Sequence, residues 1–215
     1  MKNELNKRLL TSFLIMPLSF FFIIKGSFFF TFFLSVVFLV SIYEWIKITK
    51  NFNISKITGV IFIFFSIYAA YLFRNEQGVN IFLFIIIISI FTDLGGYIFG
   101  KIFKGPKLTK ISPNKTYSGA FGGFFFSIIA GFTYFNFFIE NITLRNENYI
   151  SVIFFIFLIS LISQIGDLII SFFKRIAKIK DTGKILPGHG GLLDRIDGII
   201  FTIPSSFAIL NYINF

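Results

Sequence analysis

A segment in the last quarter of the chain, residues 171–198, combines many charged side chains with closely spaced glycines. It contains nine of the thirty Lys, Arg, Asp and Glu residues, and the only histidine. The basic side chains can neutralise phosphate, whereas the acidic ones would repel it unless a divalent cation lay between them. This mixture predicts a site for a metal and a nucleotide. The basic residues are Lys174, Arg175, Lys178, Lys180, Lys184 and Arg195, and the acidic ones are Asp181, Asp194 and Asp197.

The only histidine of the chain lies in a turn that is rich in glycine. Pro187–Gly188 and Gly190–Gly191 flank His189, which predicts a tight turn with an accessible backbone. His189 could bind a metal or act as an acid–base group, but a histidine between glycines is as often a hydrogen-bond donor to phosphate. We favour the donor role.

A second polar segment, residues 100–123, has a similar character. Pro106 and Pro113 break helices and fix turns. Glycines at 119, 122 and 123 begin the next apolar run, where free backbone N–H groups favour anions. The segment therefore predicts a second phosphate-binding loop, and the alternative is a solvated loop whose lysines only set topology. Its candidate donors are Lys110, Ser112, Asn114, Lys115 and Thr116.

The elements that position these loops are apolar. Hydrophobic residues make up 55% of the 215 residues, and a helix needs about 20 apolar residues to cross a membrane. The chain therefore predicts an all-α, polytopic membrane protein with about seven transmembrane helices. It has no cysteine, so it can form no disulfide and no thiolate metal site. The charge-free runs are 9–24, 26–43, 57–73, 77–92, 116–139, 148–166 and 198–215.

The net charge is +10, and the positions of the basic residues fit a membrane topology better than a surface that binds nucleic acid. If successive loops alternate sides, 17 of the 20 basic residues fall on one side, which the positive-inside rule makes cytoplasmic. We therefore expect a cytoplasmic N-terminus, location in the inner (cytoplasmic) membrane, and cytoplasmic loops at 101–117 and 174–197. Residues 1–215 are expected to form one membrane domain, with N-terminal helices over 1–80 and a catalytic region over 90–200.

Three acidic residues, Glu44, Asp93 and Asp167, lie at the ends of apolar runs. Acids in membrane helices usually face a bundle interior or a wet cavity. Asp167 shares a helix face with Gln164, Ser171 and Lys174, which favours a functional role. Asp93 shares its face with Gly96, Tyr97 and Gly100, whose small residues allow close helix packing. Glu44, beside Trp45, reads equally well as an ordinary interfacial carboxylate.

Three stretches of the chain resemble one family. Residues 171–197 read S-x-x-K-R-x4-K-D-x-G-x3-P-G-H-G-G-x2-D-R-x-D, which is similar to the motif of the phosphatidate cytidylyltransferases, the CDP-diacylglycerol synthases. Gln164–Asp167 resembles the family's Q-x-G-D, and Ile111–Thr116 resembles its I-S-P-N-K-T. The resemblance covers roughly residues 90–200. Tyr117–Ser118 depart from it, because many members have Trp-Glu there.

The resemblance implies transfer of a cytidylyl group from CTP to phosphatidate at the cytoplasmic face of the membrane. Mg²⁺ is the expected cofactor, with a second cation left open, and its expected ligands are Asp167 and Asp194, supported by Asp197. The expected catalytic residues are Asp167, Lys174, Arg175, Lys180, Asp181, His189, Asp194 and Arg195. The expected substrate-binding residues are Asp93, Ser112, Asn114, Lys115, Thr116, Ser171, Gly190 and Gly191.

Two other functions remain open from the residues themselves. A CTP-dependent lipid kinase would use the same charged loops but attack a different phosphorus. An ion-coupled transporter would explain the acids in the apolar runs, but not the dense, glycine-rich segment at 171–198. CTP and phosphatidate are the expected partners, a homodimer is a candidate state, and nucleic acid is not expected.

Overall fold

The structure is a computed structural model, and it describes residues 2–50, 52–109, 112–139, 148–188 and 190–213. In these ranges the chain is helical, and strand-like pairing is limited to two isolated bridges, Lys107–Thr116 and Leu186–Gly190. The all-α prediction is confirmed. The helices are α1 (Lys2–Lys25), α2 (Ser27–Ile48), α3 (Asn53–Glu76), α4 (Gly78–Phe103), α5 (Tyr117–Phe138), α7 (Tyr149–Ile176), α8 (Leu193–Ile196) and α9 (Ile199–Ile213).

The predicted apolar runs coincide with helices. Over the described residues, five helices are long and apolar enough to cross a membrane, namely α2, α3, α4, α5 and α7. Two of the seven predicted runs give shorter apolar helical stretches, Phe13–Lys25 in α1 and Ile199–Tyr212 in α9. The chain is therefore a polytopic membrane protein.

The chain divides into two compact units. The first unit comprises residues 1–71 and 173–196, and the second comprises residues 72–172 and 197–215. Both α3 and α7 continue from one unit into the other. The prediction of a single membrane domain stays a prediction.

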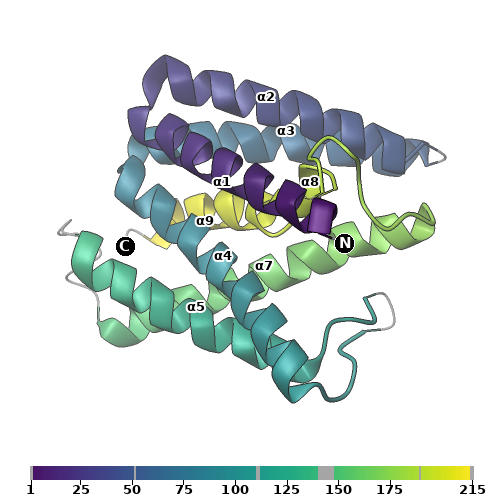
Figure 1. The fold of residues 1–215 in the computed structure, drawn as a ribbon. Coiled ribbons are helices and arrows are strands. Elements are labelled where there is room, and N and C mark those ends of the chain that lie inside the picture. Colours follow the sequence, from purple (N-terminus) through teal and green to yellow (C-terminus); the bar gives the residue numbers. More distant parts are fainter. Residues whose placement is uncertain (1, 51, 110–111, 140–147, 189, 214–215) are drawn as a thin grey trace. The chain divides into compact units, whose positions relative to one another are not determined.

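In the first unit, α1, α2 and α3 lie side by side (Figure 1). Trp45 joins α2 to the start of α3, because its indole N–H donates to the Ser55 carbonyl oxygen at 3.1 Å. Gly59 leaves space for this ring, since a Cβ there would lie 2.0 Å from the indole. The Trp45 ring also packs edge-on against Phe173 of α7, with centroids 4.8 Å apart. The end of α2 is thus fixed by aromatic packing.

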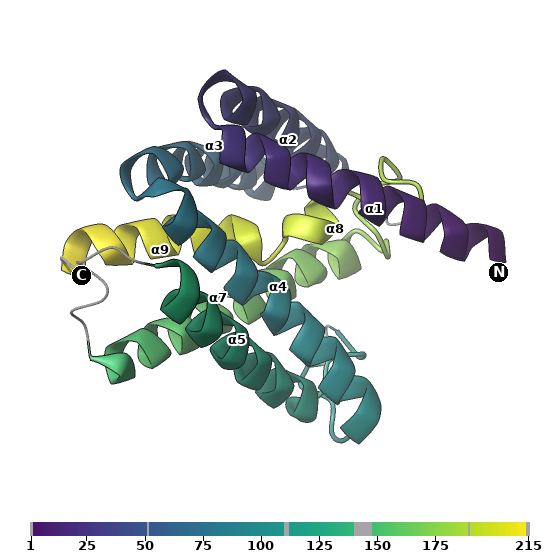
Figure 2. The ribbon, with the colours of Figure 1, turned by 60° about the vertical axis from the view of Figure 1, so that its left-hand side comes forward.

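In the second unit, α4 and α5 run against each other along most of their lengths (Figures 1 and 2). Their backbones approach closely at Gly95 and Gly122, where a Cβ on Gly95 would lie 2.2 Å from the Gly122 carbonyl oxygen. Gly95 is not among the small residues that the spacing singles out; of those, Gly96 and Gly100 face α5 less tightly, with a Cβ on either at 3.6 Å from Gly119. Buried hydroxyls join α4 to two other helices of this unit. Ser89 of α4 lies 3.0 Å from Thr202 of α9, and Thr92 of α4 donates to Ser160 of α7 at 2.9 Å.

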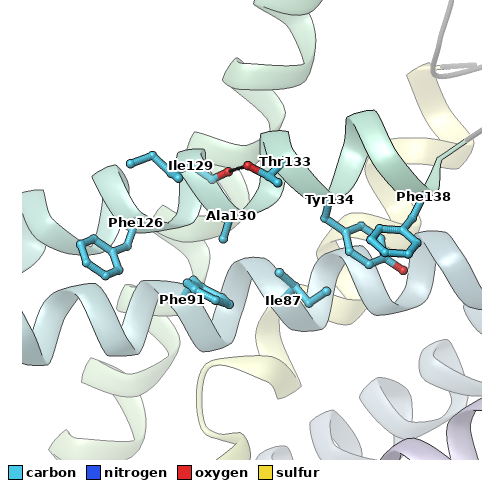
Figure 3. Close-up of a pocket in the computed structure, with 8 residues that line it drawn as sticks. All are labelled: Ile87, Phe91, Phe126, Ile129, Ala130, Thr133, Tyr134 and Phe138. Carbon is cyan, nitrogen blue, oxygen red and sulfur yellow. Dashed lines mark hydrogen bonds between the residues drawn. The ribbon is translucent and has the colours of Figure 1, made fainter.

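A hollow of about 400 Å³ lies between α4 and α5 (Figure 3). Its lining is almost entirely apolar, and the hydroxyl of Thr133 donates to the Ile129 carbonyl at 2.7 Å rather than into the space. None of its lining residues is a lysine, arginine or histidine that would attract a phosphate. The lining residues are Ile87, Phe91, Phe126, Ile129, Ala130, Thr133, Tyr134 and Phe138.

The helices extend further than the apolar runs that predict them. α4 continues past Asp93 to Phe103, and α7 continues past Asp167 to Ile176, so both acids lie inside helices rather than at their ends. α4 ends where Lys104 and Gly105 take positive φ angles of 53° and 102° just before Pro106. The connecting segments are therefore shorter than the expected 101–117 and 174–197. We call residues 104–116 the first loop and residues 177–192 the second loop.

Candidate active site

The first loop folds back on itself in the second unit. The backbone N–H of Leu108 donates to the Lys115 carbonyl at 2.8 Å, and that of Tyr117 donates to the Pro106 carbonyl at 3.2 Å. Thr116 caps α5, because its hydroxyl accepts a hydrogen bond from the Gly119 N–H at 3.1 Å. These bonds hold the Ser112–Thr116 stretch at the start of α5.

Lys115 is held by the predicted catalytic aspartate. Its Nζ lies 2.5 Å from Oδ2 of Asp167, and the two side chains are 25% and 23% exposed. The other carboxylate oxygen of Asp167 accepts a hydrogen bond from the Ser171 hydroxyl at 3.1 Å. Three of the predicted site residues thus meet in the second unit. Their partial exposure leaves both the cation and the carboxylate accessible to a ligand.

Two other predicted residues, Ser112 and Asn114, belong to the first loop, and Asp93 belongs to α4. Asn114 is exposed, and the Ser112 carbonyl accepts the Lys115 N–H at 3.0 Å. A hollow of about 370 Å³ is lined by Lys107, Leu108, Thr109 and Pro113. Asp93 is exposed on α4, and its predicted role in substrate binding stays a prediction.

A second ion pair lies in the first unit. Nζ of Lys174 lies 2.8 Å from Oδ1 of Asp194, and the side chains are only 11% and 8% exposed. Lys174 stands near the end of α7, and Asp194 lies in the short helix α8. A cation and a carboxylate so far removed from water interact more strongly than a surface pair. The pair fixes the position of the lysine ammonium.

Asp194 also organises the second loop. Its Oδ2 accepts hydrogen bonds from the backbone N–H groups of Thr182 at 2.8 Å and Gly191 at 3.0 Å, and lies 3.1 Å from the Thr182 hydroxyl. Gly190 has a φ of 88°, and a Cβ there would lie 3.1 Å from this oxygen. The glycines at 190 and 191 therefore serve the close approach of backbone to carboxylate.

Glu44 belongs to this unit, and its sequence position leaves an ordinary interfacial role and a buried role equally open. It is completely buried and accepts hydrogen bonds from the second loop and from Leu193 of α8. The signal that could have found it is an acid within an apolar helix, which usually has a specific partner. Thr182, its hydroxyl partner at 2.8 Å, has no distinguishing signal in the sequence.

The remaining predicted residues fall into three groups. Arg175, Lys180, Asp181 and Arg195 are exposed in the first unit. Asp197 is buried in the second unit, where its Oδ1 accepts the Gly198 N–H at 2.9 Å. His189 lies outside the described residues. The predicted roles of these residues stay predictions.

The donor sets differ in how well they suit a magnesium ion. In the described parts of the chain, no three Asp, Glu or His side chains gather as a ready metal cluster. Mg²⁺ is often bound by one or two carboxylates together with waters and substrate phosphates, so a cluster of three is not required. Asp167 fits this pattern because its carboxylate is partly exposed. Oδ2 of Asp194 is filled by protein donors, and only Oδ1, which faces Lys174, could meet a cation.

Comparison with known proteins finds one family model and several relatives. The model of the Cytidylyltransferase family matches residues 52–213. A phosphatidate cytidylyltransferase of Staphylococcus saprophyticus is 42% identical over 136 residues, which are 62% of this chain and 50% of that protein. One of Staphylococcus aureus is 41% identical over 147 residues, 68% of this chain and 52% of that protein. The chain thus spans about half the length of the curated relatives it matches.

Proposed function

We propose that this chain, which belongs to the cytidylyltransferase family, transfers the cytidylyl group of CTP to phosphatidate. The products would be CDP-diacylglycerol and pyrophosphate. The relatives with this printed name support the proposal, as does the uninterrupted motif at 171–197. The observation that carries it is the pairing of one lysine with one aspartate in each motif region, Lys115 with Asp167 and Lys174 with Asp194.

The reaction joins two anions, which makes charge neutralisation the main task. An oxygen of the phosphatidate phosphate attacks the α-phosphorus of CTP, and the bond from that phosphorus to the bridging oxygen of the β-phosphate breaks. No covalent nucleophile from the protein is needed, so the protein contributes positioning and positive charge. We assign Lys115 and Lys174 as contacts to substrate phosphates. Each is oriented by its aspartate before substrate arrives, which lowers the cost of ordering it.

The aspartates would also hold the cofactor. When bound, Mg²⁺ would supply positive charge that offsets the negative charge of the substrate phosphates. The proposed ligands are Asp167 in the second unit and Oδ1 of Asp194 in the first unit, and Asp197 has a supporting role. Ser171 donates to Oδ1 of Asp167 and so leaves that carboxylate in a fixed rotamer. Lys115 would then move from the carboxylate to a substrate phosphate.

The proposed location follows from the substrates. CTP arrives from the cytoplasm and phosphatidate from the membrane, so we place both loops at the cytoplasmic surface of the inner membrane. The distribution of basic residues supports this orientation.

The direct test is product identification with the purified chain in liposomes that contain phosphatidate. With CTP and Mg²⁺, mass spectrometry should detect CDP-diacylglycerol and equal amounts of pyrophosphate. Asp167→Asn should lower turnover by orders of magnitude, whereas Glu76→Gln, at an exposed acid, should not. A phosphorylated lipid together with CDP would instead identify a lipid kinase. If the wild-type chain formed neither product, the proposed function would be wrong.

A further inference from the structure

Among the acids of the first unit whose side chains the structure describes, Glu44 has the most completely enclosed carboxyl group. Its residue is 0% exposed. Oε1 accepts the Leu192 N–H at 3.0 Å, and Oε2 accepts the Leu193 N–H at 2.8 Å and the Thr182 hydroxyl at 2.8 Å. One side chain of α2 thus binds the second loop at Thr182 and at its last residue, Leu192, which lie 138 and 148 residues away in the sequence. An acid with this many protein donors has little capacity left for a substrate or a metal.

Two glycines of the second loop are shaped to this carboxyl group. A Cβ on Gly183 would lie 2.4 Å from Oε1 of Glu44, and a Cβ on Gly191 would lie 2.5 Å from Oε2. Neither residue is among those with a positive φ, so backbone conformation does not require glycine there. The glycines are instead required by the space that Glu44 fills and, at 191, also by the Thr182 hydroxyl, which would lie 2.0 Å from a Cβ. The loop sequence and Glu44 are therefore parts of one packing arrangement.

Thr182 connects Glu44 to the Lys174–Asp194 pair. Its hydroxyl lies 2.8 Å from Oε2 of Glu44 and 3.1 Å from Oδ2 of Asp194. A hydroxyl carries one proton, so it donates to one of these acids at a time. Through this hydroxyl, a displacement of Glu44 would reach the carboxylate that holds the Lys174 ammonium.

We propose that Glu44 is a positioning residue, which holds the second loop and, through Thr182 and Asp194, sets the place of Lys174. The expected effect of Glu44 on catalysis rests on the proposed function. The expected effect of Glu44 on the position of the second loop does not.

The structural part can be measured without any activity. The chain lacks cysteine, so a nitroxide can be attached to Cys at the exposed Ile185 of the second loop, or to Cys at the exposed Lys107 of the first loop. Electron paramagnetic resonance of the full chain in liposomes then reports the mobility of each loop. Glu44→Gln places an amide NH2 against the backbone N–H of either Leu192 or Leu193, so it should mobilise the label at 185 and leave the label at 107 unchanged.

Kinetics test the catalytic part. Glu44→Gln and Thr182→Val should each lower kcat/KM for CTP by about tenfold or more. The double variant should lose no more kcat/KM than the more impaired single variant, because both substitutions break the same link from Glu44 through Thr182 to Asp194. Glu44→Asp and Thr182→Ser keep the acceptor and the donor, and should restore part of the rate. Thr49→Val is the control, since that buried hydroxyl donates only to the Trp45 carbonyl of its own helix, at 2.7 Å.

The outcomes separate this inference from the function on which it rests. If the label at 185 stayed immobile in Glu44→Gln, or if kcat/KM stayed native, the positioning role would be wrong. Equal mobilisation at 185 and 107 would also overturn it, because that result indicates general unfolding. If the wild-type chain made no CDP-diacylglycerol, the proposed function would fail, while the spectroscopic comparison would still decide how the loop is held.

Discussion

At the scale of single residues, the two lysine–aspartate pairs have different environments and should respond differently to substitution. Lys115 and Asp167 are about one-quarter exposed, so this pair contributes little to stability and its lysine is free to exchange partners. Lys174 and Asp194 are almost enclosed, and breaking that pair leaves a charge with poor solvation. The first pair is therefore expected to affect catalysis, and the second to affect both catalysis and folding.

Lys115→Ala should reduce kcat/KM without changing the thermal midpoint of the protein. Loss of a charge-assisted hydrogen bond to phosphate costs about 1.5–3 kcal/mol, roughly 10- to 150-fold in rate. Lys56→Ala is the matched control, because the ammonium of that half-buried lysine donates to the Asn53 side chain, at 3.4 Å, outside both loops. Steady-state kinetics on both variants provide the measurement. A larger loss at Lys56 than at Lys115 would refute the assignment.

Lys174→Met should lower stability as well as activity. It leaves Asp194 buried with its backbone donors but without a cation, and removing one partner of a buried pair costs about 3–5 kcal/mol. We expect a clear drop in the thermal midpoint in detergent, whereas Lys184→Met, at an exposed position of the same loop, should change it little. An unchanged midpoint in Lys174→Met would show that the pair is not enclosed as described.

At the scale of elements, α4 and α5 form the support of the first loop, and glycine sets their separation. A Cβ on Gly95 would lie 2.2 Å from the Gly122 carbonyl, whereas one on the neighbouring Gly96 would meet only the Gly119 carbonyl, at 3.6 Å. Gly95→Ala should therefore destabilise the protein by about 1–3 kcal/mol through overpacking, and Gly96→Ala should be close to neutral. Thermal midpoints of the two variants test this, and equal midpoints would contradict the close packing.

The elements also show what the sequence can and cannot predict. Apolar runs locate the helices well, because burial in a membrane requires long uncharged segments. They misplace the ends, because α4 continues through Lys101 and α7 through Lys174 and Arg175 until residues with positive φ follow. The sequence motifs identify Lys115 and Asp167 as candidate site residues. Their pairing, and the partners of Glu44, depend on contacts between distant segments that spacing alone does not reveal.

At the scale of the whole molecule, orientation in the membrane is the property that the proposed chemistry most needs. Single cysteines at Lys107 or Ile185 should resist a membrane-impermeant thiol reagent in right-side-out vesicles and react once the vesicles are opened. Cysteines at Asn75 or Asn148 should react without opening, because the charge distribution places them outside. All four positions are exposed, so a failure to react with the reagent cannot be caused by burial of the side chain. Labelling of Ile185→Cys from outside would exclude a cytoplasmic site for CTP.

The most direct test of the central claim follows the phosphorus atoms of CTP. The wild-type chain is supplied with phosphatidate, Mg²⁺ and CTP labelled either at the α-phosphate or at the γ-phosphate, and the label in the lipid product is counted. Attack at the α-phosphorus predicts that α-label enters the lipid one-for-one with pyrophosphate release, and that γ-label stays in the aqueous phase. Transfer of γ-label to the lipid, or of neither label, would contradict the account.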